Sequence, residues 1–575
     1  MVWLLANATF AGAGLFLLQF VVDDFIAYTL ALYFLYAIAC LGVGLSWGQA
    51  GLLSLGQGLF VGVGAYLSGL SLIAFSDQWF LYPLLVSCCM VPGALGFGIG
   101  QLIFRGRTLN GAYFALITLG LVLLASLIAT SWNSVTGGFN GLLGVPGLPG
   151  LDGFEHAYVI SASALFVAIL MVAWLLATPL GVLWRAVAED ERRVAYLGFD
   201  PNLLKSVALG LSGLLGGLAG VLYAPINNLV TPDLFGFALS TNFIIWAAIG
   251  GRATVYGPVL GAVGIGLLTV QLRETIDYWE IILAMIFMGT VLYFKWGLLG
   301  YVEPFIKQIL IRSTAPLTPA PPRNPTGVGT LDIKGLELQV GQVRILNDLS
   351  LSIDAPGIYC LIGPNGAGKT TAFNAMTGEL SAQSGQMSIM QSVVASPDAR
   401  TLAQQGMGRK FQVPCVFDAL SISENLSLAL WTARIDRPAL LGFEALQWTS
   451  VIRQELERRF PFLTERSRLV RDLSHGQRQV LDLAIVLCTE PRLILLDEPC
   501  AGLSKAETQD VIDTVQWAAA SLGATAIIIE HDMALVKALA DKVFVLHQGH
   551  LLAEGTVAEI QGNEKVKTVY GGGSK

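Results

Sequence analysis

Residues 363–370 read G-x-x-x-x-G-K-T, a pattern that could hold a phosphate group. The apolar run IYCLI precedes it and a helical pattern follows it, so we expect a strand, a glycine-rich loop and a helix. Glycines let backbone N–H groups point at phosphate oxygens, and the helix N-terminus adds its positive dipole end. We predict that Lys369 reaches the β- and γ-phosphates and that the Thr370 hydroxyl binds Mg²⁺. The phosphate-binding residues predicted in this stretch are Gly363, Pro364, Asn365, Gly366, Ala367, Gly368, Lys369, Thr370 and Thr371.

Two adjacent carboxylates end a second apolar strand, LILLDEP, at residues 493–499. This places Asp497 at the C-terminal edge of the strand, where Mg²⁺ sits in P-loop nucleotide hydrolases generally. Glu498 is then next to the attacking water. The alternative is a buried strand that incidental acids cap, but the spacing from the glycine-rich loop favours the first interpretation.

A third such strand, TAIIIEHD at residues 525–532, ends with His531. A lone histidine is more often structural than catalytic. This one ends a strand that we expect to run parallel to the other two, and that position favours a functional role.

Between the strands lies LSHGQRQ, at residues 473–479, which is followed by the helical run VLDLAIVLC. With the glycine-rich loop, LSHGQ and LILLDEP in this order, the chain from about residue 331 to about residue 573 resembles the ATPase domain of an ABC transporter. The resemblance implies that ATP and Mg²⁺ bind here and that the domain is an ATP hydrolase coupled to transmembrane transport.

The resemblance also implies roles for single residues. Gln412, in GRKFQVP, matches the loop that senses Mg²⁺ and touches the membrane half. His531 matches the switch residue at the γ-phosphate. Three residues match the signature that contacts the ATP of an opposing ATPase domain: Ser474, Gly476 and Gln477. The predicted catalytic residues are therefore Glu498, His531 and Gln412, and the predicted metal ligands are Thr370, Gln412 and Asp497.

Two positions depart from the family pattern. The family often places an aromatic residue under the adenine where this chain has Val340, and it commonly has Asp in the loop where this chain has Ser504. These departures put adenine stacking and one contact across the ATPase dimer in question.

The composition indicates that part of the chain lies in lipid. The 575 residues are 54% hydrophobic with a mean hydropathy of +0.64, and only 13% are charged, against about 25% in a typical soluble domain. A net charge of −7 without clustered Lys and Arg argues against nucleic acid as a partner. The seven cysteines follow no metal-ligand spacing and are expected to be reduced and structural.

Up to Lys307 the sequence repeats apolar runs long enough to cross a membrane, which takes about 20 residues. From a cytoplasmic N-terminus, ten spans leave only Arg273 outside among the Lys and Arg of this half, as the positive-inside rule requires. The third span could be re-entrant and the eighth is short. The spans are predicted near residues 2–22, 25–47, 51–76, 79–104, 111–130, 158–180, 203–225, 237–251, 254–271 and 280–294.

A proline-rich stretch, residues 313–330, separates the two halves. It holds five prolines and no apolar run, so we expect an extended, semi-rigid linker that tethers the second half without dictating how it docks. After it, short apolar runs alternate with helical patterns. The fold class predicted is a polytopic α-helical membrane domain fused to an α/β P-loop ATPase domain. The domains predicted are a transmembrane permease domain (1–312), the linker (313–330) and an ABC ATP-binding domain (331–575).

The first half resembles the permeases of branched-chain amino acid and urea uptake systems, over most of residues 25–300. Three glycine-rich stretches carry this resemblance, at residues 51–66 (GLLSLGQGLFVGVGAY), 136–146 (TGGFNGLLGVP) and 248–262 (AIGGRATVYGPVLGA). The glycines have a structural alternative, because small residues allow close helix crossing in lipid. Candidates for contact with a polar solute are Ser54, Gln57 and Asn242.

Residues 184–200, WRAVAEDERRVAYLGFD, mix both charge signs with small apolar residues. They could form a solvated face between two helices. Resemblance to the permease family implies instead the coupling helix that docks on an ATPase domain near Gln412. The recipient could be the ATPase domain of this chain or that of a partner.

Together, the resemblances imply a fused permease and ATPase subunit of an ABC importer that moves urea or a related short amide inward, with branched-chain amino acids next. LSHGQ, LHQG (546–549), LAEGT (552–556) and the closing VYGG resemble the urea-type branch. The alternatives are an ABC exporter and a membrane-anchored ATPase that signals without moving solute.

The partners implied are a second permease subunit, a second ABC ATPase subunit, an extracytoplasmic solute-binding protein and membrane lipid. The location implied is the bacterial plasma (inner) membrane, which the chain crosses several times, with the ATPase domain in the cytoplasm.

Overall fold

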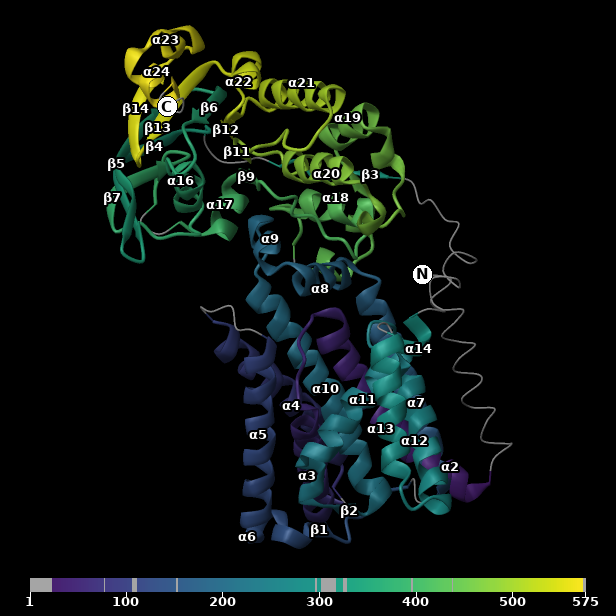
Figure 1. The fold of residues 1–575 in the computed structure, drawn as a ribbon. Coiled ribbons are helices and arrows are strands. Elements are labelled where there is room, and N and C mark those ends of the chain that lie inside the picture. The colour runs from purple at the N-terminus through teal and green to yellow at the C-terminus, as the bar shows by residue number, and fades with distance from the viewer. Residues whose placement is uncertain are drawn as a thin grey trace. The chain divides into compact units, whose positions relative to one another are not determined.

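The protein is represented by a computed structural model, shown as a ribbon in Figure 1. The chain divides into two compact units, one of Met1–Ala188 and Pro201–Thr314, the other of Glu189–Asp200 and Ala315–Lys575, and each is described by itself. The structure describes residues 23–76, 78–105, 111–150, 154–294, 297–300, 317–323, 328–394, 397–436 and 438–571.

The first unit is mainly helical. The long helix α10 packs against α4, α3 and α2, and α2 packs in turn against α7 and α12. Its longer helices are α2 (Asp24–Val43), α3 (Gln57–Phe75), α4 (Leu81–Phe104), α5 (Gly111–Ser131), α7 (Phe154–Leu176), α8 (Pro179–Glu189), α10 (Pro201–Asn227), α11 (Phe237–Gly250), α12 (Gly257–Thr275) and α13 (Trp279–Tyr293). Its short elements are η1 (Gly44–Gln49), α6 (Asn133–Thr136), η2 (Gly138–Asn140), β1 (Leu142–Leu143), β2 (Leu229–Val230), η3 (Pro232–Phe235) and α14 (Gly297–Gly300).

Six helices of the described residues are long and apolar enough to cross a membrane: α2 with its continuation η1, α3, α4, α5, α7 and α10. Helices α11, α12 and α13 coincide with the last three predicted spans and have 14, 19 and 15 residues. The prediction of a polytopic helical membrane domain is confirmed, with ten as an approximate span count. The first predicted span, 2–22, lies outside the described residues.

Glycines allow α3 and α10 to cross closely. A Cβ atom on Gly64 would lie 2.4 Å from the carbonyl oxygen of Gly217, and one on Gly220 would lie 2.0 Å from that of Val61. Because no real Cβ contact is this short, only hydrogen fits at these two positions. This supports the structural explanation of the glycine-rich stretches, in which small residues bring helices together in lipid.

Gln57, one of the candidates for solute contact, lies at the start of α3 and hydrogen-bonds residues of α2 and α10. Its Nε2 donates to the carbonyl oxygens of Ala39 (3.0 Å) and Ser212 (3.3 Å), and its Oε1 accepts from the Ser212 hydroxyl (3.0 Å). The residue is 1% exposed. Ser54 is also buried, whereas Asn242 on α11 is half-buried. The amide of Gln57 is thus occupied by α2, α3 and α10 themselves.

The second unit is built on a six-stranded sheet in the order β14-β13-β6-β12-β11-β9, in which every neighbouring pair is parallel except β13 and β14. A second, antiparallel sheet has the order β5-β4-β7-β8. The strands of the first sheet are β6 (Gly357–Ile362), β9 (Met407–Lys410), β11 (Leu493–Asp497), β12 (Thr525–Ile529), β13 (Lys542–His547) and β14 (His550–Gly555). Those of the second are β4 (Leu331–Val340), β5 (Val343–Ile353), β7 (Ser384–Ile389) and β8 (Ser392–Val393).

Apolar side chains from both sheets share one core with the helix that follows β6. Leu346 of β5, Leu495 of β11 and Phe373 of α16 are all fully buried in it. The helices are α16 (Lys369–Met376), α17 (Ala399–Gln405), α18 (Ile422–Trp431), α19 (Val451–Arg459), α20 (His475–Cys488), α21 (Lys505–Leu522), α22 (Met533–Leu539), α23 (Val557–Gly562) and α24 (Glu564–Gly571). This confirms the predicted α/β P-loop fold class.

Two further segments belong to this second unit. Residues 189–200, which contain helix α9 (Glu191–Tyr196), pack on it although they come from the middle of the first half of the chain. Part of the proline-rich stretch also packs on it, because β3 (Thr318–Pro319) pairs in parallel with β10 (Trp448–Thr449). Within the described residues, this part of the predicted linker is therefore paired with the ATPase unit.

Candidate nucleotide site and the segment that contacts it

The predicted phosphate-binding, metal-binding and catalytic residues lie at or just after the C-terminal ends of four neighbouring strands. Strands β6, β12, β11 and β9 are adjacent and parallel, so the loops that follow them lie along one edge of the sheet. These loops contain the glycine-rich stretch, His531, Glu498 and Gln412. The expectation that the strand before His531 runs parallel to the other two is confirmed.

The glycine-rich loop joins β6 to α16, as predicted. Gly366 and Gly368 have φ values of 80° and 99°, which L side chains rarely adopt. The Lys369 ammonium group donates to the carbonyl oxygens of Gly363 (2.8 Å) and Pro364 (3.1 Å). Burial lowers the pKa of Lys369, and the carboxylates of Glu498 and Asp497 at the end of β11 partly oppose this shift. The loop thus holds a cation beside backbone turned by glycine, which suits an anion.

The predicted metal ligands supply oxygen atoms. The Thr370 hydroxyl hydrogen-bonds the carboxylate of Asp497, which is 3% exposed. Burial raises the pKa of Asp497, and nearby cationic groups, Arg409 first, partly offset the shift. Gln412 offers an amide oxygen from an exposed position after β9. Hydroxyl, carboxylate and amide oxygens are ligands that Mg²⁺ accepts, so the residues present fit this ion.

Glu498 is held between two other predicted catalytic residues. Gln412 Nε2 donates to one carboxylate oxygen of Glu498 at 2.9 Å, and His531 Nδ1 lies 3.5 Å from the other. The backbone of Glu498 has φ 44°, an uncommon value for a residue with a side chain. Its N–H donates to the Ile529 carbonyl oxygen of the adjacent strand (3.0 Å), which fixes that conformation. The structure therefore brings Glu498, Gln412 and His531 together.

A buried acid that the sequence analysis did not single out lies beside this group. Glu530 is 2% exposed, and its Oε1 has no hydrogen-bond partner among the described residues. Burial raises the pKa of Glu530 to about 7, and the negative charge of Glu498 adds to the shift. With Glu498 and His531 it lines an open cavity of about 510 Å³, to which Cys500 and Lys505 also contribute.

The predicted signature residues begin helix α20. The Ser474 hydroxyl accepts from the Gln477 N–H (3.2 Å), and the Gln477 amide oxygen accepts from the Ser474 N–H (3.1 Å), which makes a capping box. A Cβ atom on Gly476 would lie 2.9 Å from a Glu507 carboxylate oxygen. Within the described residues, no hydrogen bond of Ser474 or Gln477 reaches the glycine-rich loop.

The two departures from the family pattern have local explanations. Ser504 is the N-cap of α21 and makes a capping box with Glu507, so its hydroxyl accepts from the Glu507 N–H (3.4 Å). Val340 is the last residue of β4 and is 46% exposed. The structure therefore uses Ser504 as a helix N-cap and places Val340 at an exposed strand end.

The segment 189–200 contacts the ATPase unit close to Gln412. The Glu189 carboxylate accepts hydrogen bonds from the backbone N–H groups of Asp418 and Ala419 (3.1 Å for Ala419). The Tyr196 ring meets the Phe411 ring edge-on, with 5.0 Å between ring centroids. The ATPase unit of the same chain thus receives this segment.

A buried ion pair anchors the segment. Arg193 donates to the Asp482 carboxylate on α20 at 2.6 Å and to the Arg409 carbonyl oxygen on β9 at 2.8 Å. The two charged side chains are 2% and 0% exposed. Burial raises the pKa of Asp482, while the charges of Arg193 and Lys410 oppose the shift.

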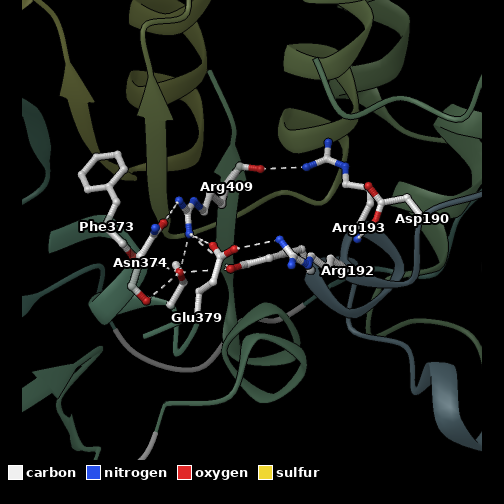
Figure 2. A network of polar contacts seen from close by, with 9 residues as sticks. Asp190, Arg192, Arg193, Phe373, Asn374, Glu379 and Arg409 are labelled. Carbon is white, nitrogen blue, oxygen red and sulfur yellow. Dashed lines mark hydrogen bonds and ion pairs between the residues drawn. The ribbon is translucent and has the colours of Figure 1, made fainter. Parts of the chain in front are cut away.

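Arg409 joins this segment to the helix that follows the glycine-rich loop, as Figure 2 shows. Its guanidinium group donates to Asn374 (2.5 Å) and Thr377 (2.5 Å) at the end of α16. The same group donates to the Tyr196 hydroxyl (3.2 Å) and lies over its ring. Glu379 pairs with both Arg409 and Arg192, at 3.3 Å each. One buried side chain therefore touches both the phosphate-loop helix and residues 189–200.

Sequence reasoning placed the segment near Gln412 but missed the residues that hold it. Asp482 interrupts the apolar run VLDLAIVLC, and a charge on the buried face of a helix signals a charged partner. Arg409 and Lys410 end a strand whose four residues are all buried. The sequence contains both signals, but it does not show which residue of the other half of the chain contacts these charged groups.

Comparison with known families agrees with both units. Residues 25–295 match the family described as branched-chain amino acid transport system / permease component. Residues 346–501 match the ABC transporter family.

Several relatives match the ATPase half. The high-affinity branched-chain amino acid transport ATP-binding protein LivG of Salmonella typhimurium is 32% identical over 250 residues, which is 42% of this chain and 96% of that protein. The lipopolysaccharide export system ATP-binding protein LptB of Escherichia coli K12 is 31% identical over 243 residues, 42% of this chain and 97% of that protein. A solved structure of a nucleotide-free ATP-binding cassette from an ABC transporter, 24% identical, covers 42% of this chain and 99% of that chain with a TM-score of 0.37.

These findings define the chemistry of the chain. Its ATPase domain binds nucleotide and hydrolyses ATP, and the hydrolysis is coupled to transport by a helical membrane domain. The protein lies in the inner membrane with its ATPase domain in the cytoplasm. The chain belongs to the ABC transporters, as a fusion of a branched-chain amino acid type permease domain with an ABC ATPase domain.

Proposed function

We propose that the protein is the fused permease and ATPase subunit of an ABC importer for a small polar solute. The observation that carries the proposal is the Arg409 contact, in which one guanidinium group bonds the end of the phosphate-loop helix and Tyr196. Tyr196 belongs to a segment whose two ends continue into α8 and α10 of the membrane unit. A shift of the phosphate-loop helix therefore has a short, buried route to residues that lead into membrane helices.

Within this proposal, Glu498 polarises the water that attacks the γ-phosphate. Gln412 and His531 orient its two carboxylate oxygens. Lys369 and the loop N–H groups would hold the phosphates, and Thr370 and Asp497 would hold Mg²⁺, which would supply charge neutralisation on the phosphate oxygens. Ser474, Gly476 and Gln477 contact the nucleotide of a second ATPase domain. ATP binding closes the pair of domains and hydrolysis resets the permease.

The direction of transport rests on the permease half. The relatives of the ATPase half include proteins named for amino acid transport and for lipopolysaccharide export, so this half is neutral on direction. Six described helices of the permease half are long and apolar enough to cross a membrane, and α11 (14 residues), α12 (19 residues) and α13 (15 residues) lie where three further spans are predicted. Counted with these three, the spans outnumber the six long spans per half that exporters commonly have, which supports import. Import also implies a second permease subunit, a second ATPase subunit and a solute-binding protein.

Two solute classes remain to be separated. The motifs of the ATPase half that resemble the urea-type branch support urea or a short amide. The family description and the name of the LivG relative support branched-chain amino acids. Titration of the partner solute-binding protein with urea, short amides and leucine, followed by calorimetry, decides between these classes.

The mechanism is tested by ATP-driven uptake of labelled solute into proteoliposomes that contain all partner subunits. We expect Glu498→Gln to bind Mg-ATP as the wild type does but to lose at least a hundredfold in multi-turnover uptake, because the carboxylate that polarises water is gone. Glu444→Gln, an exposed change on the same unit, is the matched control and should transport normally. Wild-type uptake by Glu498→Gln over many cycles would disprove the mechanism.

A further inference from the structure

Residues 317–323 of the proline-rich stretch lie on the ATPase unit and add a short strand, β3, which forms a separate two-stranded sheet with β10. Thr318 and Pro319 pair in parallel with Trp448 and Thr449. The Ala320 N–H then donates to the Thr449 carbonyl oxygen at 2.8 Å. A linker that served only as a tether would not need these directed backbone bonds, because a proline-rich chain is stiff without partners.

Arg323 fixes the end of this added strand at the C-termini of two helices. Its guanidinium group donates to the carbonyl oxygens of Ala403 (2.7 Å) and Gln404 (3.3 Å) in the last turn of α17. It also donates to the carbonyl oxygen of Thr489, the residue after α20. Unpaired carbonyls and the helix dipole favour a cation at such ends. Burial lowers the pKa of Arg323 to about 10, so the group keeps its charge at neutral pH.

A second arginine ties the added strand to the residues after α18. Arg434 donates from Nε to the Pro321 carbonyl oxygen (3.0 Å) and from NH1 to the Leu430 carbonyl oxygen (3.0 Å). Its remaining nitrogen pairs with Glu490 at 2.6 Å, and the arginine side chain is 2% exposed. Residues 317–323 therefore touch α17, the end of α20 and the stretch after α18 at once.

The same two stretches also receive the segment 189–200. The Gln404 side-chain amide donates to the Gly198 carbonyl oxygen at 2.8 Å. The backbone carbonyl oxygen of Gln404 accepts from Arg323. The Thr432 hydroxyl, two residues before Arg434, donates to the Leu197 carbonyl oxygen at 3.0 Å. The end of α17 and residues 432–434 are thus shared between the two segments.

We propose that residues 317–323 are a strap, built into the fused chain, with Arg323 as its positioning residue. The strap holds in place the two stretches that receive residues 189–200, which are the end of α17 and residues 432–434. The strap joins the end of α17, which precedes β9 and Gln412, to the end of α20, which begins at the signature. This strap goes beyond the proposed function, because the segment that covalently joins the two domains then takes part in coupling ATP hydrolysis to transport. Only the second readout below rests on that function.

The first test is hydrogen exchange, followed by mass spectrometry on the full chain in lipid nanodiscs. The Ala320 amide is expected to exchange at least tenfold more slowly than an unstructured amide. Arg323→Ala should remove this protection and also speed exchange at residues 403–406. Arg344→Ala, which changes an arginine that is 58% exposed, is the matched control and should leave both peptides unchanged. Exchange of Ala320 at the unstructured rate in the wild type would overturn the strap.

The second test measures solute moved per ATP hydrolysed in proteoliposomes with the partner subunits. Arg323→Ala should lower this ratio several-fold while Mg-ATP binding stays as in the wild type, and Arg323→Lys should restore part of it because one cation returns. Should Arg323→Ala fail to fold, Ala320→Pro removes the bonded N–H and should also lower the ratio. Pro319→Ala is its control, since Pro319 is exposed and has no N–H to lose.

The two readouts separate the possible failures. An unchanged ratio in both strap variants overturns the positioning role, even if exchange shows that the strap is bound. Absence of any wild-type uptake counts against the proposed function, and the exchange measurement then still decides whether residues 317–323 bind the ATPase unit.

Discussion

Two regions of the ATPase unit differ in how their charged groups meet water. At the nucleotide edge Asp497 is buried, but the two groups that contact Glu498 are open, since the His531 side chain is 67% exposed and Gln412 is exposed. Where residues 189–200 are held, Arg193 is 2% and Asp482 0% exposed, and Arg409 is buried between them and α16. The groups that orient Glu498 are thus exposed, whereas the groups that hold residues 189–200 are buried.

This difference follows from what each region must do. Catalytic groups exchange partners when nucleotide binds, and an exposed hydrogen bond is inexpensive to break because water replaces it. A contact that transmits force must keep its partners, and a buried pair resists separation because each lone charge would be stranded in a low dielectric. Changes at the first region should therefore alter rates, and changes at the second should alter stability.

The largest effect is expected at the nucleotide edge, on rate alone. His531→Ala should reduce ATP hydrolysis at least a hundredfold, because one of the two groups that orient Glu498 is lost. The change in unfolding free energy should stay within about 0.5 kcal/mol, since the side chain is largely exposed. Phosphate release and chemical denaturation of the full chain measure the two quantities. A large loss of stability would erase the contrast between the regions.

Arg193→Ala should destabilise the ATPase unit by about 3–5 kcal/mol, because it leaves Asp482 buried and unpaired. Denaturant unfolding of the full chain, followed by reactivity of the buried Cys488 on α20, measures this loss. The double variant Arg193→Met, Asp482→Leu should recover most of the stability, since no charge is then stranded. A loss of unfolding free energy below about 1 kcal/mol for Arg193→Ala would mean that the Arg193–Asp482 pair does not anchor the segment.

Glu530 predicts a pH dependence of smaller size. Its pKa is about 7 in the folded protein, above the usual value of 4.5, so the folded state binds the proton more tightly than the unfolded state does. The stability it contributes is present at low pH and is lost as pH rises from about 4.5 through 7, by up to ~3 kcal/mol. Glu530→Gln should flatten this decline in thermal-unfolding midpoints measured between pH 5 and 8. A decline equal to that of the wild type would assign the pH dependence to other groups.

The smallest effect is expected for Arg192→Ala. Arg192 is 76% exposed and pairs with Glu379 at 3.3 Å, and an exposed ion pair contributes about 0–1 kcal/mol. Neighbouring arginines of α9 thus make a matched pair of substitutions. If Arg192→Ala and Arg193→Ala destabilise the chain equally in the same unfolding experiment, burial does not explain the anchor.

The sequence predicts the nucleotide edge well because each motif there is local. A strand, a glycine-rich loop and a helix can be recognised from adjacent residues around Lys369, and the acids after β11 mark a strand end. Parallel pairing then brings the strand ends together without further information. The membrane helices are predictable for a similar reason, since about 20 apolar residues are a local property.

The contacts that hold residues 189–200 and 317–323 are not local. Arg193 meets Asp482 across 289 positions of sequence, and Arg323 meets Thr489 across 166. Periodicity and composition indicate that each residue is charged or lies in an extended segment, but they do not specify the partner. Gln57 is a similar case, because its amide suggests a polar path whereas the fold uses it to join three helices.

The central claim is that the nucleotide edge acts on the membrane domain through Arg409 and Tyr196. The most direct test is the number of solute molecules moved per ATP hydrolysed by Tyr196→Ala in proteoliposomes with all partner subunits. The Tyr196 hydroxyl donates to Thr377 at 3.1 Å and its ring packs against Phe411, so the change removes the route without touching nucleotide ligands. The account predicts continued ATP hydrolysis with the ratio reduced at least tenfold, and a normal ratio for Arg192→Ala. A wild-type ratio for Tyr196→Ala would contradict it.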